Sequence, residues 1–228
     1  MKKYVMLAIS ALLALQACKK DNQQAPEEQP LKEIPQIPVQ ENQKAITGIT
    51  VDNNGIVYTQ INQELSYNKF ITIDADGNGQ NDFYFTSVLI YHDNQSHMYL
   101  LASPVSKAGG KLQLDTLQEL VMNGMWAKPL DAGTNINSTA QPNCVWSSFM
   151  IKGVTLDVID NSPQAKTFNG PWVGKADKYL AIQLRINGKI HNGWVRISHT
   201  AGEQRMVLTG YAYNATPVET IKAGQTLK

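Results

Sequence analysis

Short runs of alternating apolar and polar residues follow one another from residue 45 to the end of the chain. They are rich in Val, Ile, Thr, Tyr and Phe and are separated by Gly, Asn, Asp and Pro, which is typical of β-strands joined by turns. The pattern predicts an all-β fold, a sandwich or a partly closed barrel of about ten short strands with little helix. Only Leu114–Met125 has apolar residues at helical spacing, which predicts at most a short helix there. The predicted strands are Ile46–Val51, Ile56–Ile61, Phe70–Ile73, Phe83–His92, Met98–Ala102, Lys111–Leu114, Val145–Ile151, Thr155–Val158, Tyr179–Ile186, Lys189–Ser198 and Met206–Tyr213.

The dipeptide Asn187-Gly188 predicts a tight hairpin, because a type I′ turn needs positive φ at both of its central residues. Pairing outward from this turn sets Trp194 opposite Ala181 on one face of the sheet, and His191 opposite Leu184 on the other. His191 therefore falls on an apolar face, which favours a hydrogen-bonded core histidine over a metal ligand or a general base. No histidine has H-x-x-E-H or H-E-x-x-H spacing, so no zinc site is predicted.

The first eighteen residues have the pattern of a secretory signal. Lys2 and Lys3 precede the apolar run Val5–Leu15, which is too short to span a membrane permanently but has the length of a signal h-region. The run ends in Leu15-Gln16-Ala17-Cys18, which resembles the lipobox of bacterial lipoproteins. We expect residues 1–17 to be a lipoprotein signal peptide and Cys18 to carry covalent lipid, palmitate included. The alternative is an ordinary signal peptide followed by an incidental cysteine.

The stretch that follows, residues 18–44, is rich in Gln, Pro, Glu and Lys and has few apolar residues. Such a composition predicts a flexible tether, and a single β domain is expected at residues 45–228. Lys19 stands where an inner-membrane retention signal would have Asp, which favours the outer membrane by similarity to known sorting rules. Lys19-Lys20-Asp21 is also similar to the export tag of some surface lipoproteins. The sequence leaves both the periplasmic and the surface side open.

Charge and cysteine content exclude two further features. The chain has 20 basic and 19 acidic residues, and the first 17 residues contain two lysines and no acid, so 18 basic residues face 19 acidic ones after cleavage. This neutrality argues against nucleic acid as a partner, because phosphates require a basic patch. With Cys18 lipidated, Cys144 has no internal partner, and no intramolecular disulfide is expected. No base lies beside Cys144 in the sequence, which favours a buried structural cysteine over a nucleophile.

One acidic loop between two predicted strands has the spacing of a cation site. Side-chain oxygens recur at alternate positions, and Gly79 permits a sharp turn that brings a backbone carbonyl inward. Oxygen-only ligands of this kind favour Ca²⁺ over a transition metal. The loop is similar to the first nine positions of an EF-hand but has Phe85 in place of the final Glu, and the alternative is a polar turn without an ion. The predicted ligands are Asp74, Asp76, Asn78, Gln80 through its carbonyl, and Asp82.

The acidic loop and the late hairpin together resemble an uncharacterised family of secreted and lipid-anchored bacterial all-β proteins. That family has an Asp-x-Asp-Gly-x-Gly-x-x-Asp-Phe element early in the chain and a Gly-x-x-His-x-Gly-Trp-Val-Arg hairpin late. Two positions depart from it, since Ala181 stands where Gly is usual and Asn192 where an aromatic residue is usual. The resemblance covers most of residues 50–225 and implies an exported all-β domain without an assigned reaction. The matching residues are Asp74–Phe83, Gly170-Pro171-Trp172, Tyr179-Leu180, Gly188, His191–Arg196 and Gly210–Tyr213.

No motif assigns a reaction to the chain. The sequence has no G-x-S-x-G elbow, no phosphate-binding glycine loop and no Cys/His signature near Cys144. We therefore expect a protein that is not an enzyme. The alternative is a polysaccharide-acting or other hydrolytic enzyme of the envelope, whose carboxylate pair would not be recognisable in the sequence.

The tryptophans indicate where a ligand could bind. Trp126 and Trp194 are candidate ligand platforms, because flat aromatic rings stack on sugars or anchor partner proteins. We expect Trp146 and Trp172 to fill the core instead. The sequence thus favours a binding or structural module of the cell envelope, with the membrane, a glycan or an envelope protein as partner.

Overall fold

In a computed structural model, the described residues all lie between Gln43 and Lys228. The predicted signal peptide, Cys18 and the tether fall outside the described residues. Within the described part of the chain there is no helix, and therefore none long and apolar enough to cross a membrane. The structure describes residues 47–51, 55–105, 107–119, 125–148, 154–162 and 165–226.

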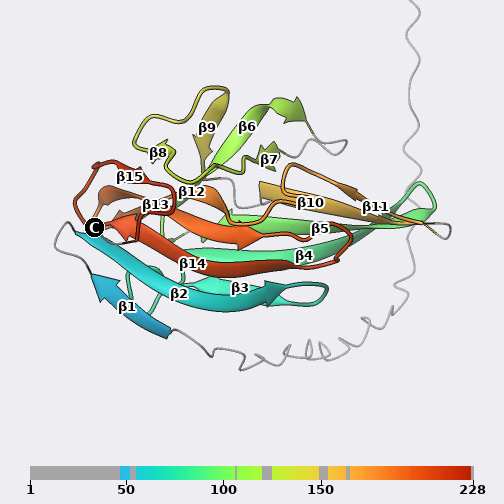
Figure 1. Ribbon diagram of the computed structural model, residues 1–228, viewed down its shortest axis with the longest axis horizontal. Coiled ribbons are helices and arrows are strands. Elements are labelled where there is room, and N and C mark those ends of the chain that lie inside the picture. The colour runs from blue at the N-terminus through green and yellow to red at the C-terminus, as the bar shows by residue number, and fades with distance from the viewer. Residues whose placement is uncertain are drawn as a thin grey trace, which may run out of the picture. The chain divides into compact units, whose positions relative to one another are not determined.

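The described residues form fifteen strands, in agreement with the predicted all-β class. Thirteen belong to one sheet with the order β1-β2-β14-β13-β12-β6-β7-β10-β5-β4-β3, in which β9 also pairs with β6 and β11 with β10 (Figure 1). This sheet curls into a partly closed barrel, while β8 and β15 form a separate pair. The strands are β1 (Thr47–Val51), β2 (Ile56–Leu65), β3 (Phe70–Ile73), β4 (Phe83–His92), β5 (Gln95–Pro104), β6 (Lys111–Glu119), β7 (Met125–Ala127), β8 (Asn135–Ile136), β9 (Cys144–Ser147), β10 (Val154–Asn161), β11 (Lys166–Asn169), β12 (Lys178–Ile186), β13 (Lys189–Ser198), β14 (Met206–Asn214) and β15 (Ile221–Lys222).

The strands in the middle of the sheet are buried on both faces. Alternate residues such as Leu180 and Val195 join the main core, to which β2 to β6 and β10 also contribute. The residues between them face a second cluster, in which Trp194 packs with Ile136 and Ile221 from the β8–β15 pair. Double burial explains why both faces of these strands carry apolar residues, and why the polar side chains Gln183, His191 and Asn192 are buried as well.

The Asn187-Gly188 hairpin has the predicted geometry. Its two central residues have φ of 50° and 78°, as a type I′ turn requires. Trp194 pairs with Ala181 and His191 with Leu184, which confirms the predicted register. His191 is buried and donates a hydrogen bond of 2.9 Å from Nδ1 to the carbonyl of Asn214, so it is a core histidine as expected.

The helix predicted over Leu114–Met125 is wrong. The strand β6 continues to Glu119, and Met125 begins β7. Leu114 pairs with Ala127 on one side and with Val145 on the other. Pairing with strands distant in sequence therefore outweighs a weak helical spacing of three apolar residues.

Candidate metal centre

The acidic loop connects two neighbouring antiparallel strands. Asp74 directly follows β3, and Asp82 directly precedes β4. The N–H of Asp82 donates to the carbonyl of Ile73 at 2.7 Å, and the carbonyl of Asp82 accepts from the N–H of Val105 at 2.7 Å. The base of the loop is therefore fixed both to β3 and to the residue that follows β5.

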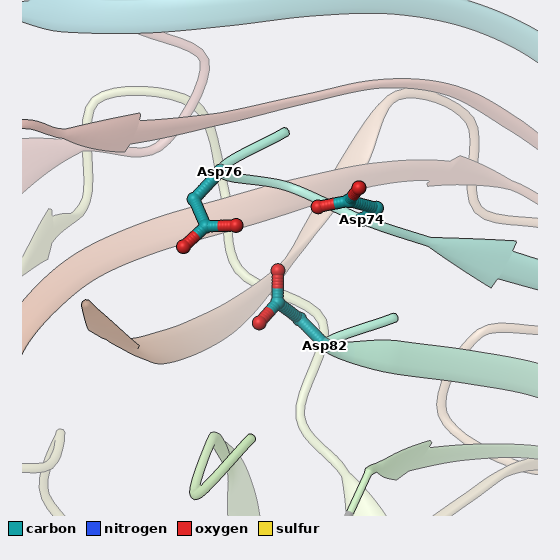
Figure 2. A group of neighbouring side chains, drawn as sticks. All are labelled: Asp74, Asp76 and Asp82. Atoms are coloured by element: carbon teal, nitrogen blue, oxygen red, sulfur yellow. The ribbon is translucent and has the colours of Figure 1, made fainter. Parts of the chain in front are cut away.

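The three aspartates of the loop converge on one point. Their carboxylates face one another in Figure 2, and one oxygen of each lies within 4.8 Å of the other two. Asp82 is buried, and Asp74 and Asp76 are partly buried. Among the described residues this is the only group of three or more His, Cys, Asp or Glu side chains with such geometry. Of the five residues predicted as ligands, the structure brings the side chains of three together, namely Asp74, Asp76 and Asp82.

Backbone amides of the loop hold these carboxylates in place. The Asp74 carboxylate accepts hydrogen bonds from the N–H groups of Gly77 at 2.9 Å, Asn78 at 3.1 Å and Gly79 at 2.8 Å. Gly79 has φ of 84°, which is the sharp turn predicted at this position. The Asp76 carboxylate accepts from the N–H of Asn78 at 3.1 Å. The chain thus wraps around the acidic side chains before any ion is considered.

The carboxamide of Asn78 is engaged within the loop. Its Nδ2 donates to Asp76 at 2.9 Å, and its Oδ1 accepts from the N–H of Gln80 at 2.7 Å. An amide oxygen with one hydrogen bond keeps a second lone pair for a cation. The structure therefore places the Asn78 side chain beside the Asp76 carboxylate, and it connects the N–H of Gln80, not its carbonyl, to Asn78.

Asp82 is the electrostatically unusual member of the group. The residue is 4% exposed, and its Oδ2 accepts a hydrogen bond of 2.8 Å from the N–H of Ala75. Burial is the largest cause that raises the pKa of Asp82 to about 6; the hydrogen bond from Ala75 opposes the rise, and the charges of Asp76 and Asp74 add to it. Relative to the ordinary value of 3.8, ionising Asp82 in the folded protein costs about 3 kcal/mol. A bound cation would remove this cost, because it supplies the missing positive charge.

The strand β14 supports the loop in a way that the sequence did not reveal. The Tyr211 hydroxyl donates to the backbone carbonyl of Asp74 at 3.3 Å. Burial raises the pKa of the Tyr211 phenol, and the nearby carboxylates of Asp74 and Asp82 raise it further. The only signal in the sequence is the inward register of Tyr211 in its strand, which does not identify the loop as its partner.

The two candidate platforms are not open surfaces. Trp126 is 8% exposed and packs with Tyr99 and Val158, whereas Trp194 is 1% exposed and meets Tyr179 edge to face at 5.1 Å. Both rings were predicted as platforms from their flat aromatic shape, but each packs in a cluster of neighbouring side chains. The interpretation of Trp126 and Trp194 as open platforms is therefore corrected.

Trp172 fills the core, as expected. It is fully buried, and its indole Nε1 donates to the carbonyl of Ala127 at 2.8 Å. Trp146 is only partly buried, at the margin of the second cluster. Cys144 is also partly buried, and burial raises the pKa of its thiol, which disfavours the reactive thiolate.

Outside the acidic loop, Asp157 and His199 form a fully buried pair. The Asp157 carboxylate accepts from His199 Nδ1 at 2.5 Å and from the N–H of Trp172 at 3.1 Å. His199 Nε2 donates to the carbonyl of Glu203 at 2.8 Å. The carbonyl of Glu203 can only accept, so Nε2 carries a proton, and the hydrogen bonds to Asp157 and Glu203 raise the pKa of His199, which favours an ion pair with Asp157 although burial raises the pKa of that carboxyl as well.

The complete chain was also compared with known proteins. No protein-family model, no curated protein and no solved structure matches it. The resemblance based on the Asp74–Phe83 loop and the late hairpin therefore stays a prediction.

Proposed function

We propose that this chain is a lipid-anchored protein of the bacterial outer membrane whose β domain is a binding or structural module stabilised by Ca²⁺. The proposal of a calcium site rests on Asp74, Asp76 and Asp82, since one carboxylate oxygen of each lies within 4.8 Å of the other two. The anchor rests on the Leu15-Gln16-Ala17-Cys18 element. A glycan or an envelope protein is the proposed partner.

The chemistry of the donors favours Ca²⁺ among common cations. All three charged ligands are carboxylates, and the neighbouring polar groups are amides, which suits a hard cation with six to eight oxygen ligands. Zinc prefers nitrogen and sulfur donors, and neither His nor Cys belongs to the group. Magnesium keeps most of its water and seldom occupies such all-protein sites.

The position of the loop indicates a structural role for the ion. Asp74 follows the end of β3 and Asp82 precedes the start of β4, and these two strands pair with each other. Ala75, in the loop that joins them, is buried in the main core. An ion bound here would tie the ends of β3 and β4 together and neutralise the buried charge of Asp82. This role supports a stabilised module rather than a reaction.

Titration of Ca²⁺ into the full chain tests the calcium part. If only the folded state binds, a hundredfold excess over Kd stabilises it by roughly 2.7 kcal/mol. We expect Kd of about 10⁻⁴ to 10⁻³ M, because the loop offers three charges and no bidentate Glu. Millimolar Ca²⁺ should raise Tm in the wild type and more than Mg²⁺ does.

Matched variants separate specific binding from a general charge effect. Asp76→Asn keeps the shape of the side chain and an acceptor for the Asn78 amide, but it removes one ligand charge. Glu219→Gln removes one charge from an exposed side chain elsewhere. The Tm response to Ca²⁺ should disappear in Asp76→Asn and persist in Glu219→Gln. An equal response in all three proteins would mean that the loop is a turn without an ion.

A further inference from the structure

The strand β4 is longer than its neighbour β3. Pairing between them ends at Phe70 and Thr86, and the Ser87 hydroxyl then donates to the carbonyl of Ser66 at 3.1 Å. Val88–His92 continues as a strand that pairs with β5 on one side only (Figure 1). On its other side, no strand in the described part of the chain pairs with it. Since no described strand occupies the backbone groups on that side, they can pair with an added strand.

Apolar side chains gather around this free edge. Val88, Leu89 and Tyr91 are exposed on it, and Tyr67 and Phe70 are exposed beside it, where β3 begins. These five residues, the β4 edge patch, make up five of the eight large exposed apolar side chains among the described residues. Scattered single residues of this kind are ordinary, but a concentration along one unpaired strand marks an interaction surface.

The edge also lacks the features that normally prevent pairing. Native sheets protect their edges with charged side chains, prolines or bulges. Val88–Tyr91 contains no charged residue and no proline, and β4 pairs with β5 in continuous register from Phe83 to His92 without a bulge. By contrast, β11, on the far side of β10, presents exposed Lys166 and Asn169.

We propose that Val88–His92 pairs antiparallel with the same strand of a second copy of this chain, about a two-fold axis at Ile90. This register sets Val88 opposite His92 of the second copy, and Leu89 opposite Tyr91 of the second copy. Aliphatic–aromatic pairs stabilise antiparallel strands. The strand is therefore complementary to itself, as a two-fold interface requires.

Charge and surface area both fit a second copy. The register brings Asp93 of the second copy opposite Ser87, next to the turn that carries exposed Lys69. The hairpin tip of each copy thus meets Tyr67 and Phe70 of the other. Three aromatic residues of the patch are more than half exposed, so roughly 100 Å² of each can be covered. Together with the paired strands of both copies, the buried area reaches the order of 1,000 Å² at which specific interfaces begin.

Disulfide trapping in cells that make the full chain tests the proposed register. In a Cys144→Ser background, Ile90→Cys places two thiols opposite each other across the axis, within disulfide range. We expect Ile90→Cys to form a species of twice the chain mass under mild oxidation. Leu117→Cys, at a more exposed position on β6, should stay monomeric although its thiol is easier to reach, and the background alone reports any bridge through Cys18.

Two further cross-linking experiments test whether the dimer has the proposed register. Differently tagged Val88→Cys and His92→Cys chains should form mixed dimers, whereas Val88→Cys alone should form at least fivefold fewer. Lysines introduced by Leu89→Lys and Tyr91→Lys should lower the Ile90→Cys yield at least fivefold, with Leu117→Lys as the control. A yield for Ile90→Cys no higher than for Leu117→Cys would overturn the proposal. A cross-link of Ile90→Cys to a species of another mass would do the same, since the occupant would be a different protein.

Discussion

The N–H of Ala75 donates a 2.8 Å hydrogen bond to the Asp82 carboxylate, while the Ala75 side chain is buried in the main core. One residue therefore connects the acid of the loop to the packing of the barrel. Asp82 cannot move toward solvent without disturbing Ala75. This relationship explains why an ionisable group stays buried beside two other carboxylates.

The raised pKa of Asp82 gives the calcium-free protein a specific pH dependence. Its folded pKa is about 6 against an ordinary 3.8, so the folded state binds the proton more tightly than the unfolded state does. The contribution of Asp82 to stability is fully present below about pH 4 and is lost as pH rises through 6. In EGTA, urea denaturation should show Asp82→Asn to be more stable than the wild type at pH 7.5, by up to about 3 kcal/mol.

The same comparison at lower pH provides the control. Near pH 4.5 the wild-type side chain is protonated in the folded state, so the difference between Asp82→Asn and the wild type should shrink to a fraction of its value at pH 7.5. Saturating Ca²⁺ should also remove the advantage of Asp82→Asn at pH 7.5, because the wild type alone keeps all three carboxylates. A difference that is independent of pH would show that Asp82 ionises in the folded protein as easily as in solvent.

Local patterns were sufficient for much of the fold. The predicted bounds of β3, β4 and β13 match the structure, because Asp74, Asp82, Asp93 and Gly188 stand directly at four of their ends. The loop carboxylates could also be found from sequence, since they lie within nine residues of one another. In these segments, the information that determines the structure is close by in the chain.

Contacts between distant segments could not be predicted. Tyr211 bonds to Asp74 across 137 residues, and Asp157 bonds to His199 across 42. The pairing of β8 with β15 joins two dipeptides without any alternation of their own. The β8–β15 pair covers the ring of Trp194. The exposure of this ring therefore could not be predicted from the strand to which Trp194 belongs.

The hairpin at Asn187-Gly188 should be sensitive to substitution at its second position. Gly188 has φ of 78° and no atom within 4 Å of an added Cβ, so only backbone strain opposes a side chain there. We expect Gly188→Val to lower the free energy of unfolding by about 1–2 kcal/mol. Gly188→Asn, which tolerates positive φ, should cost less than half as much in the same denaturation experiment. Equal losses for Val and Asn would mean that the turn does not keep its left-handed geometry.

The proposed anchor predicts a change in processing. Cys18→Ala removes the thiol to which lipid would be attached, so the variant should remain as an unlipidated precursor or be released in soluble form. Labelling with radioactive palmitate and fractionation of membranes would measure this, with Cys144→Ser as the control that keeps its label. A Cys18→Ala protein that is still cut after Ala17 and fully bound to membranes would contradict the anchor.

The buried pair Asp157–His199 predicts a large loss of stability when one partner is removed. Burial alone would lower the pKa of His199, but its hydrogen bonds to Asp157 and Glu203 outweigh burial and raise it. Asp157→Asn leaves the imidazolium buried without its counter-charge, which should cost about 3–5 kcal/mol in urea denaturation at pH 6. Adding His199→Gln to Asp157→Asn should recover part of this loss, so a double-mutant cycle should give a coupling of at least about 1 kcal/mol. Additive losses would show that the two side chains do not stabilise each other, and His199 would then be neutral in the folded protein.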